Sequence, residues 1–387
     1  MSSLCRSQAG RPMQCSRPRA KYLAILRRRL REGRLLELLG QGLRLCRYPL
    51  ARKYARVPPG PFMATLVVAE TCPCACAMCP LPGRPHGIPL DLKGWSRVLD
   101  GLVTLGTPSV ALTGGEPLTN PFLPELVAAA HERGLYTRLA STGIGLSPTL
   151  AEKLVEAGLD ELGISLDSPS AEVVDLFRKR SGAHAAALEA LSILGKTKRR
   201  KHLLLGLACV LRNENVEELP ALFSLAKKLE VDFFALNPLH LLPEDQAPAT
   251  APFRLGLTPP AARQARAHAL DGRDHGFPVD NSPAFFDTVS DFAEQGFLAI
   301  PCLAPWNSLT IDLDGTAYPC WPLFLRRRLA LGQAFPSPTA LWRSRNTNVL
   351  RQALRHCRAC CWDCQTELTL LSPRWSRLPL PSRAALR

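Results

Sequence analysis

Residues Val67 to Pro80 read VVAETCPCACAMCP, and the organisation of the whole chain can be worked out from this stretch. An apolar run ending at Ala69 is followed by four cysteines within eight residues, 72–79. Three of them, Cys72, Cys76 and Cys79, have C-x3-C-x2-C spacing. Because a chain covers about 3.3 Å per residue, three thiolates on one such loop can converge on a single metal cluster.

The triplet has the donor type of an iron–sulfur cubane, which is usually held by four cysteine thiolates. Three ligands leave one iron open to a substrate or cofactor, and that arrangement is catalytic rather than structural. Two alternatives stay open at this point. Cys76 and Cys79 alone form a C-x-x-C pair, which is compatible with a zinc knuckle or a redox dithiol, and Cys74 can replace one member of the triplet.

Around this stretch, apolar runs of strand length alternate with helical patterns. The helical patterns lie at 123–133, 148–157, 183–194 and 216–229. Six β-then-α units in series predict an α/β fold with a parallel sheet, either doubly wound or a barrel. In both, chemistry belongs at the carboxyl ends of the strands. The predicted strands are Ala64–Val68, Ser109–Thr113, Tyr136–Ala140, Glu161–Leu166, Leu203–Leu211 and Phe233–Asn237.

A second motif, Thr113-Gly-Gly-Glu-Pro117, begins 34 residues after Cys79, at the end of the second predicted strand. Its glycines let the backbone approach a ligand closely, and its carboxylate can accept hydrogen bonds from an ammonium group. GGEP alone is a weak turn motif. In combination with the cysteine triplet it is a specific signal.

Together the two motifs resemble the radical S-adenosylmethionine (radical SAM) superfamily over roughly residues 62–240. The resemblance implies a partial (β/α)6 TIM-like barrel. It also implies that Cys72, Cys76 and Cys79 hold a 4Fe-4S cluster whose open iron binds the amino and carboxylate groups of S-adenosylmethionine. The resemblance implies further contacts to this cofactor. Met78, in the cysteine loop, would contact the adenine. At the strand ends, the ammonium group would be bound by Gly114, Gly115 and Glu116, and the carboxylate or ribose by Ser141, Ser165 and Asp167.

The cofactor determines the chemistry that the resemblance implies. A reduced cluster gives one electron to the sulfonium, which releases methionine and a 5′-deoxyadenosyl radical that abstracts hydrogen from a carbon centre. An external one-electron reductant of the flavodoxin or ferredoxin type supplies the electron. Relatives modify peptides, sugars and cofactor or lipid precursors, so a peptide or small-molecule substrate is expected. The protein binds and orients the reactants and excludes water; neither motif identifies a catalytic residue.

A second group of cysteines lies in the last hundred residues. Cys302 and Cys320 stand 18 residues apart around a predicted hairpin, with strands at 308–313 and 315–318. A structural zinc site is one interpretation. The pattern resembles the SPASM/twitch extension of radical SAM enzymes, and its shorter twitch form, with one auxiliary 4Fe-4S cluster, fits better. The implied ligands are Cys302, Cys320, Cys357 and Cys360, with Cys361 and Cys364 able to substitute.

These motifs predict five parts of the chain. A basic N-terminal segment, disordered and then helical, covers 1–60, and the radical SAM core barrel covers 61–245. A connecting segment (246–300) leads to the auxiliary cluster domain (301–370), a small cysteine-rich hairpin and helix extension, and 371–387 form a basic tail.

The net charge of +15 is concentrated at the ends of the chain. Residues 1–60 hold 15 Lys and Arg against two acids, and 61–370 are close to neutral. A nucleic-acid enzyme usually spreads basic residues over its body, so no nucleic-acid partner is expected. Residues 21–48 have the pattern of a basic amphipathic helix, which Gly33 and Gly40 split in two. Such a helix can make a peripheral membrane contact; we favour the interpretation that it packs its leucines onto the body of the protein.

The compartment is predicted from cysteine usage. The chain has 14 cysteines and 387 residues, no recognisable secretory signal, and no apolar run of the roughly 20 residues that span a bilayer. Clustered cysteines of this kind favour a reducing compartment. We therefore expect a cytoplasmic enzyme, at most peripheral to the membrane. The alternative function is a non-catalytic zinc-binding or scaffold protein attached to membrane or nucleic acid through its basic N-terminus.

Overall fold

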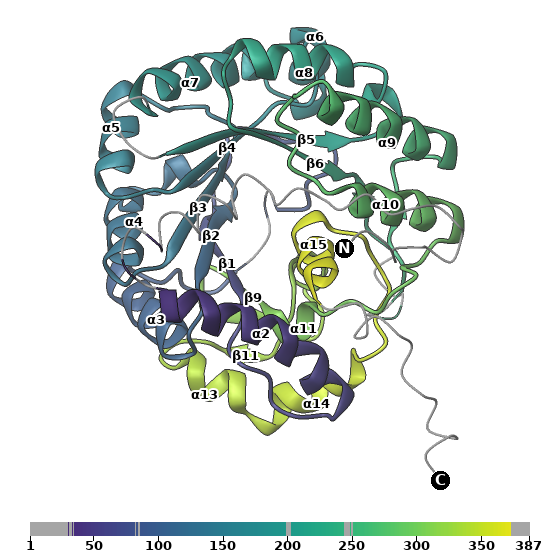
Figure 1. Ribbon diagram of the computed structural model, residues 1–387. Coiled ribbons are helices and arrows are strands. Elements are labelled where there is room, and N and C mark those ends of the chain that lie inside the picture. Colours follow the sequence, from purple (N-terminus) through teal and green to yellow (C-terminus); the bar gives the residue numbers. More distant parts are fainter. Residues whose placement is uncertain are drawn as a thin grey trace.

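Six parallel strands that follow the chain in order form most of one curved sheet, with the sixth strand at its edge (Figure 1). The computed structural model describes residues 30, 33, 35–81, 83, 86–198, 203–243, 248 and 251–372. Each of the six predicted strands is confirmed to within one residue at either end. Their bounds are β1 Met63–Ala69, β2 Ser109–Gly114, β3 Tyr136–Ser141, β4 Glu161–Ser165, β5 Leu204–Leu211 and β6 Phe233–Pro238.

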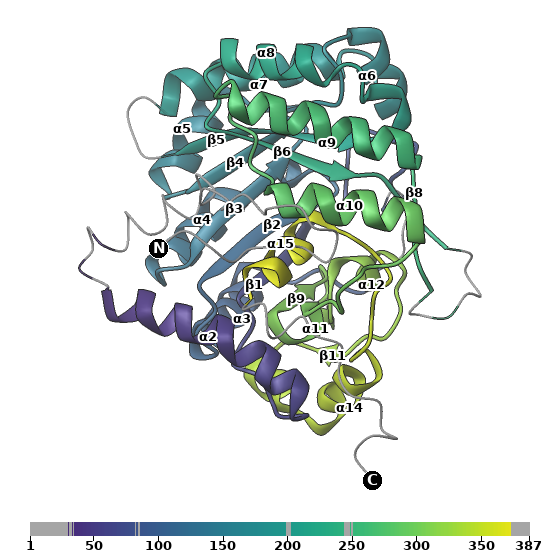
Figure 2. The same cartoon turned by 45° about the vertical axis from the view of Figure 1, so that its right-hand side comes forward.

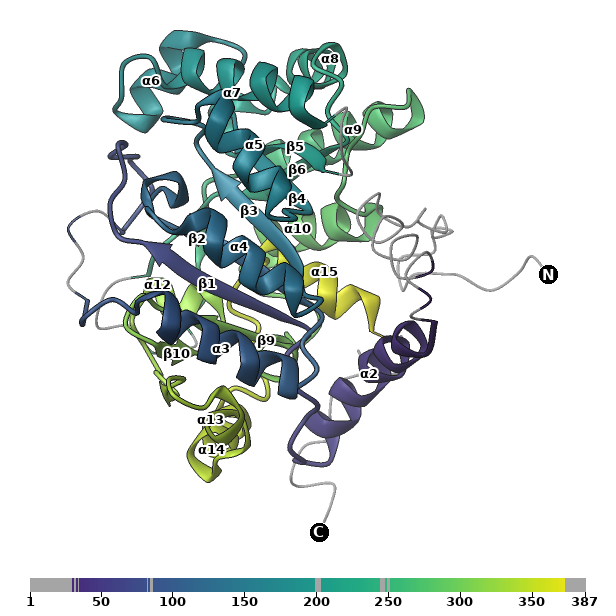
Figure 3. The same ribbon diagram turned by 90° about the vertical axis from the view of Figure 1, so that its left-hand side faces the viewer.

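The outer face of this sheet is covered by helices that connect the strands, and Figure 3 shows α3, α4 and α5 laid over β1 to β3. All seven residues of β1 are buried, as expected for a parallel strand covered on both faces. In α3, the Asp91 side chain accepts a hydrogen bond from the Gly94 amide at 2.7 Å and caps the helix. The covering helices are α3 Leu92–Thr104, α4 Leu123–Glu132, α5 Pro148–Glu156, α6 Ala171–Arg178, α7 Ala183–Lys198 and α8 Leu219–Lys228.

The predicted C-terminal hairpin joins the same sheet. Strand β9 (Ser308–Ile311) pairs in parallel with β1, with Met63 opposite Ser308. Its hairpin partner β10 (Thr316–Tyr318) is antiparallel to it and is followed by β11 (Gly332–Gln333). Gly315 has a φ of +84° in the connecting turn, a conformation that favours glycine. The sheet order is therefore β11-β10-β9-β1-β2-β3-β4-β5-β6 in the described part of the chain.

The remaining helices lie beyond β6 and around the hairpin. Helix α15 contacts β6, α10 and α11, and Figures 1 and 2 show it on the inner side of the curved sheet, between the β6 end and the β9 end. A separate two-stranded sheet is formed by β7 (His240–Leu241) and β8 (Arg254–Leu255). The other helices are α9 Pro259–Asp274, α10 Pro283–Gln295, α11 Ala304–Asn307, α12 Trp321–Leu325, α13 Pro338–Arg343, α14 Arg345–Ala353 and α15 Asp363–Leu371.

Helix α2 (Leu35–Lys53) precedes the sheet and begins after Gly33, which lies in a turn with a φ of +68° and confirms the break expected there. The break expected at Gly40 was wrong. The helix continues through Gly40 without a break, because neither Gly40 nor Gly42 takes a positive φ. Two of the leucines that were expected to pack inward do not, since Leu39 and Leu43 are 59% and 67% exposed. The helix is held instead by Tyr48 and Ala51, which pack against Trp306. Most of residues 1–34, and the tail after 372, lie outside the described residues.

Among the described residues, no helix has the length and apolar character that a membrane crossing requires.

Candidate active site

The first cysteine group lies on the loop after β1, at the carboxyl end of the sheet. The C-terminus of α6 holds this loop by two backbone hydrogen bonds. The Ala75 amide donates to the carbonyl of Arg178 at 3.1 Å, and the Ala77 amide donates to the carbonyl of Phe177 at 3.2 Å. A tight turn follows, in which the Cys79 amide donates to the Cys76 carbonyl at 3.1 Å. The end of one helix thus fixes the path of the loop.

Three of the loop thiols are in direct contact. The Cys74 thiol hydrogen-bonds to both Cys72 and Cys76 and lies between them. This hydrogen bond lowers the pKa of Cys72 to about 7, against the effect of burial, and the charge of Arg178 acts in the same direction. The second hydrogen bond, between Cys74 and Cys76, lowers the pKa of Cys76 in the same way. A lowered pKa favours the thiolate, which is the form that binds metal.

The two glycines of GGEP are required by the backbone of this loop. A Cβ on Gly115 would lie 2.3 Å from the carbonyl oxygen of Thr71, and one on Gly114 would lie 2.5 Å from that of Ala69. Gly114 also has a φ of +140°. The close approach allows the Gly115 amide to donate to Ala69 at 2.9 Å and the Glu116 amide to donate to Thr71 at 2.8 Å. GGEP therefore ties the end of β2 to the stem of the cysteine loop.

The Glu116 carboxylate is fully buried. It accepts hydrogen bonds from the Leu118 amide (3.1 Å), the Ser141 hydroxyl (2.7 Å), and both the amide (2.7 Å) and the hydroxyl (2.5 Å) of Thr142. An ionised carboxylate has about four acceptor positions, and these contacts use them. Glu116 and Ser141 thus join the ends of β2 and β3, and the contacts to a cofactor implied for both stay predictions.

Asp167, which follows β4, forms a buried ion pair with Arg178. Its Oδ2 lies 2.5 Å from Nη2 of Arg178, and its Oδ1 accepts from the Val210 amide at 2.9 Å. Both side chains are at least 95% buried. Arg178 also acts electrostatically on the thiols of Cys72 and Cys76. The sequence did not single out Arg178, because it lies in no predicted element and no motif spacing connects it to the cysteines.

The other predicted cofactor contacts are less constrained. Ser165, at the carboxyl end of β4, is partly buried, and its hydroxyl has no hydrogen-bond partner within the described part of the chain. Met78 is also partly buried and lies on the cysteine loop itself. Their roles toward the adenine and the ribose or carboxylate are not tested by these contacts and stay predictions.

A cavity of about 390 Å³ opens beside the cysteine loop. Its lining includes residues at the ends of two neighbouring strands: Ala69 and Glu70 at the end of β1, and Asp312 and Leu313 after β9. Gly115 of GGEP also lines it. His86 enters the cavity and approaches Glu70, with 2.6 Å between Nε2 and Oε1. Hydrogen bonds to the Gly87 carbonyl and to Glu70 raise the pKa of His86. This volume is within the range of small-molecule sites.

The second cysteine group is brought together by non-local contacts. The Cys302 amide donates to the Cys357 carbonyl at 2.9 Å, which joins the two halves of the group. The buried thiol of Cys360 interacts electrostatically with Cys302, Cys320 and Cys357. Burial raises the pKa of all four thiols, that of Cys302 to about 12. Such thiols are neutral without a metal and lose their protons when one binds.

Cys361 and Cys364 differ from those four. The Cys361 thiol lies 3.6 Å from Nε2 of His240, which also accepts from the Cys361 amide at 3.2 Å. His240 is buried and stacks on Trp362, with 4.8 Å between the ring centroids. The thiol of Cys364, which belongs to α15, interacts electrostatically with that of Cys320. Of the two substitute ligands, Cys361 is thus engaged elsewhere, whereas Cys364 stays close to the group.

Arg52 was also missed by the sequence analysis. It extends from α2 to the auxiliary group, where its Nη1 donates to the carbonyl of Pro301 at 3.1 Å. The side chain is buried, and burial lowers the pKa of Arg52 to about 10, against the effect of Cys302. Arg52 lies beyond the helix predicted over 21–48 and belongs to no motif, so the sequence alone gives no signal for this contact.

The donor sets suit iron–sulfur clusters, since both groups are composed of thiols. No set of three or more His, Cys, Asp or Glu side chains is arranged to coordinate a single metal ion within the described ranges. In the first group, the hydrogen bonds of Cys74 to Cys72 and Cys76 occupy the space between those two thiols. A bound cluster would replace these hydrogen bonds by sulfur–iron bonds.

Comparison with known proteins agrees with both sites. The radical SAM superfamily model matches residues 66–226, and the model of SPASM, an iron–sulfur cluster-binding domain, matches residues 302–365. A PqqA peptide cyclase of Ruegeria pomeroyi is 32% identical over 271 residues, which cover 68% of each chain. A PqqA peptide cyclase of Granulibacter bethesdensis is 31% identical over 174 residues, 44% of this chain and 45% of that relative.

The fold has solved counterparts. The structure of Streptococcus suis SuiB bound to the precursor peptide SuiA superposes with a TM-score of 0.63 at 14% identity, covering 86% of this chain and 78% of SuiB. The domain matches and the cyclase relatives set aside the non-catalytic zinc-binding or scaffold alternative. The chain therefore belongs to the radical SAM superfamily, as an enzyme with S-adenosylmethionine and a 4Fe-4S cluster as cofactors and an auxiliary iron–sulfur cluster in its SPASM domain.

Proposed function

We propose that this enzyme reductively cleaves S-adenosylmethionine and uses the 5′-deoxyadenosyl radical to modify a carbon centre of a peptide. The observation that carries the proposal is the connection between the cysteine loop and GGEP. The Gly115 and Glu116 amides bond to Ala69 and Thr71, directly before Cys72. The triplet and the end of β2 are thus held against each other at the edge of the sheet where the cavity opens.

Each group of residues has a role in this proposal. Cys72, Cys76 and Cys79 hold the first cluster, which supplies one electron to the sulfonium of the cofactor. Arg178 places a buried positive charge beside the thiolates, fixed by Asp167. Ser165 offers a hydroxyl to the cofactor at the adjoining strand end. Burial of the polar groups keeps water from the reacting atoms and strengthens their electrostatic interactions.

In the second site, Cys302, Cys320, Cys357 and Cys360 hold the auxiliary cluster. The electron that the first cluster needs comes from an external flavodoxin- or ferredoxin-like reductant in the cytoplasm. The choice of a peptide over a sugar or another small molecule rests on the relatives. The two curated relatives are named for a peptide, PqqA, and the similar fold of SuiB was solved with a precursor peptide.

The test is release of 5′-deoxyadenosine from S-adenosylmethionine by anaerobically reconstituted protein after reduction with dithionite. We expect release by the wild type and only background release by Cys76→Ala. The matched control is Cys209→Ala, which removes a buried thiol within β5 and should retain release. Equal release by Cys76→Ala and the wild type would contradict the proposal. The peptide is tested separately, by transfer of deuterium from labelled candidate peptides to 5′-deoxyadenosine.

A further inference from the structure

A cavity of about 610 Å³ lies at the other end of the sheet. It is lined by Gly60, which precedes β1, and by Leu105, which precedes β2. The cysteine loop follows the carboxyl end of β1, so the seven residues of that strand separate the two sites. At 3.3 Å per residue this is roughly 20 Å. The cavity is therefore distinct from the reaction site.

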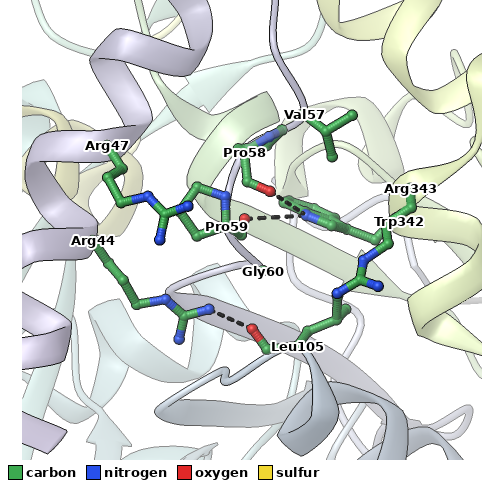
Figure 4. Close-up of a pocket in the computed structure, with 9 residues that line it drawn as sticks. All are labelled: Arg44, Arg47, Val57, Pro58, Pro59, Gly60, Leu105, Trp342 and Arg343. Atoms are coloured by element: carbon green, nitrogen blue, oxygen red, sulfur yellow. Dashed lines mark hydrogen bonds between the residues drawn. The ribbon is translucent and has the colours of Figure 1, made fainter.

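Three arginines converge on this cavity, which we call the arginine cavity. Figure 4 shows Arg44 and Arg47 of α2 on one side and Arg343, at the end of α13, on the other; the guanidinium group of Arg47 points toward Pro59, and those of Arg44 and Arg343 lie near Leu105. Arg44 donates to the carbonyl of Leu105. Within the described ranges, none of the three arginines forms an ion pair with a carboxylate. Three guanidinium groups without an acidic partner predict an anionic ligand.

The two terminal stretches of the chain do not match such a ligand in charge. Residues 1–29 and 373–387 contain no Asp or Glu and are rich in arginine. A segment of this composition would be repelled by the cavity. Charge complementarity therefore favours an occupant from another molecule.

The remaining walls of the cavity are apolar. Trp342 is almost fully buried, and its indole N–H is used by the carbonyls of Pro58 (3.4 Å) and Pro59 (3.1 Å). Helix α2, which carries Arg44 and Arg47, also exposes Leu39, Leu43 and Leu50, which share one face because their spacing is four and seven residues. Arginine side chains next to exposed leucines, over a buried tryptophan, are typical of a protein–peptide interface.

We propose that the arginine cavity binds an acidic segment of a peptide, with its carboxylates between the arginines and its apolar side chains on the α2 leucines. A peptide is favoured over a membrane surface because the guanidinium groups line a concave site, whereas a bilayer meets a helix along its outer face. The inference extends the proposed function, from which the preference for a peptide partly comes. The bound segment lies away from the reaction site and serves to attach the peptide.

The test measures binding without cofactors. A fluorescein-labelled 12-residue peptide of glutamate and leucine is titrated with the full chain, and fluorescence anisotropy is read. The control peptide has glutamine in place of each glutamate. We expect the wild type to bind only the acidic peptide, and Arg47→Glu with Arg343→Glu to weaken this binding by about tenfold or more, as reversed interfacial charges do. The matched variant Lys153→Glu reverses the charge of an exposed residue of α5 and should bind the acidic peptide like the wild type.

Equal binding of the acidic peptide by the doubly reversed variant would overturn the inference, and so would equal binding of both peptides by the wild type. Sedimentation with phosphatidylglycerol vesicles is the second arm. Wild-type protein that sediments with these vesicles but binds no peptide would also overturn it. Release of 5′-deoxyadenosine by the doubly reversed variant should match the wild type, which shows that it is folded. Absence of release from every form would count against the proposed function alone.

Discussion

The carboxylate of Asp167 and the guanidinium of Arg178 lie 2.5 Å apart with almost no exposure to solvent. This ion pair connects β4 to α6, whose last carbonyls hold the cysteine loop. Asp167 has a further contact, since its Oδ1 also accepts a hydrogen bond from the Val210 amide. The ion pair therefore links the sheet to the helix that holds the first cysteine group.

Arg178→Met should destabilise the protein strongly, because it leaves the Asp167 carboxylate buried without its cation. Breaking a buried pair in this way costs about 3–5 kcal/mol, measured as the free energy of unfolding in urea. The matched control is Arg263→Met, which breaks an ion pair of the same 2.5 Å length to Glu294 on the surface. That loss should stay below about 1 kcal/mol. A similar loss of unfolding free energy in the two variants would contradict the larger contribution expected of the buried pair.

The thiol of Cys72 should be reactive at neutral pH in protein freed of its clusters. The hydrogen bond from Cys74 lowers the pKa of Cys72 from 9.0 to about 7, so the thiolate fraction rises through pH 7 rather than pH 9. Alkylation by iodoacetamide, followed by mass spectrometry against pH, should have its midpoint there. In Cys74→Ala the midpoint should move upward, because the stabilising donor is lost. Cys209, whose pKa burial raises, should stay unlabelled; a Cys72 midpoint near 9 in the wild type would contradict the expectation.

The sequence predicted the parts of this protein that local patterns determine. The strands of the core follow from apolar runs of the right length, and the triplet Cys72, Cys76 and Cys79 lies on a single loop. Both signals need only neighbouring residues. GGEP was identified in the same way, although its glycines turn out to accommodate the backbone of Ala69 and Thr71.

What the sequence could not predict depends on contacts between distant segments. The pairing of β9 with β1 places the C-terminal hairpin in the main sheet, and no periodicity encodes that choice of partner. The contact of His240 with Cys361 spans 121 residues. Arg52 and Arg178 are buried charges that no motif or predicted helix of the sequence contains. Tertiary packing decides each of these cases.

Gly115→Ala should disturb the cysteine loop. The added Cβ would meet the carbonyl of Thr71 at 2.3 Å, and backbone cannot move aside as a flexible side chain would. We expect a loss of about 2 kcal/mol in the free energy of unfolding and a lower iron content after reconstitution. Gly195→Ala is the matched control, since a Cβ there has no neighbour within 4 Å. Within helix α7 it should be neutral or stabilise by up to about 1 kcal/mol. Unchanged stability and iron content in Gly115→Ala would argue against the close approach.

Cys360 and Cys361 are adjacent in sequence, but only one of them should be needed for the auxiliary cluster. The thiol of Cys360 interacts with Cys302, Cys320 and Cys357, whereas that of Cys361 lies against His240. Two 4Fe-4S clusters correspond to about eight irons per chain. Cys360→Ala should therefore lose about half of the iron and sulfide of the reconstituted wild type, while Cys361→Ala should keep nearly all of it.

The first cluster serves as the internal control for this comparison. Cys360→Ala should still change its electron paramagnetic resonance signal when S-adenosylmethionine is added to the reduced protein, because the thiols of 72–79 are untouched. Loss of iron in Cys361→Ala, with retention in Cys360→Ala, would exchange the two assignments. Equal loss in both would indicate that the turn between them, held by the hydrogen bond from the Cys361 amide to His240, matters more than either thiol. His240→Phe separates that case, since it removes the acceptor while keeping both cysteines and a ring to stack on Trp362.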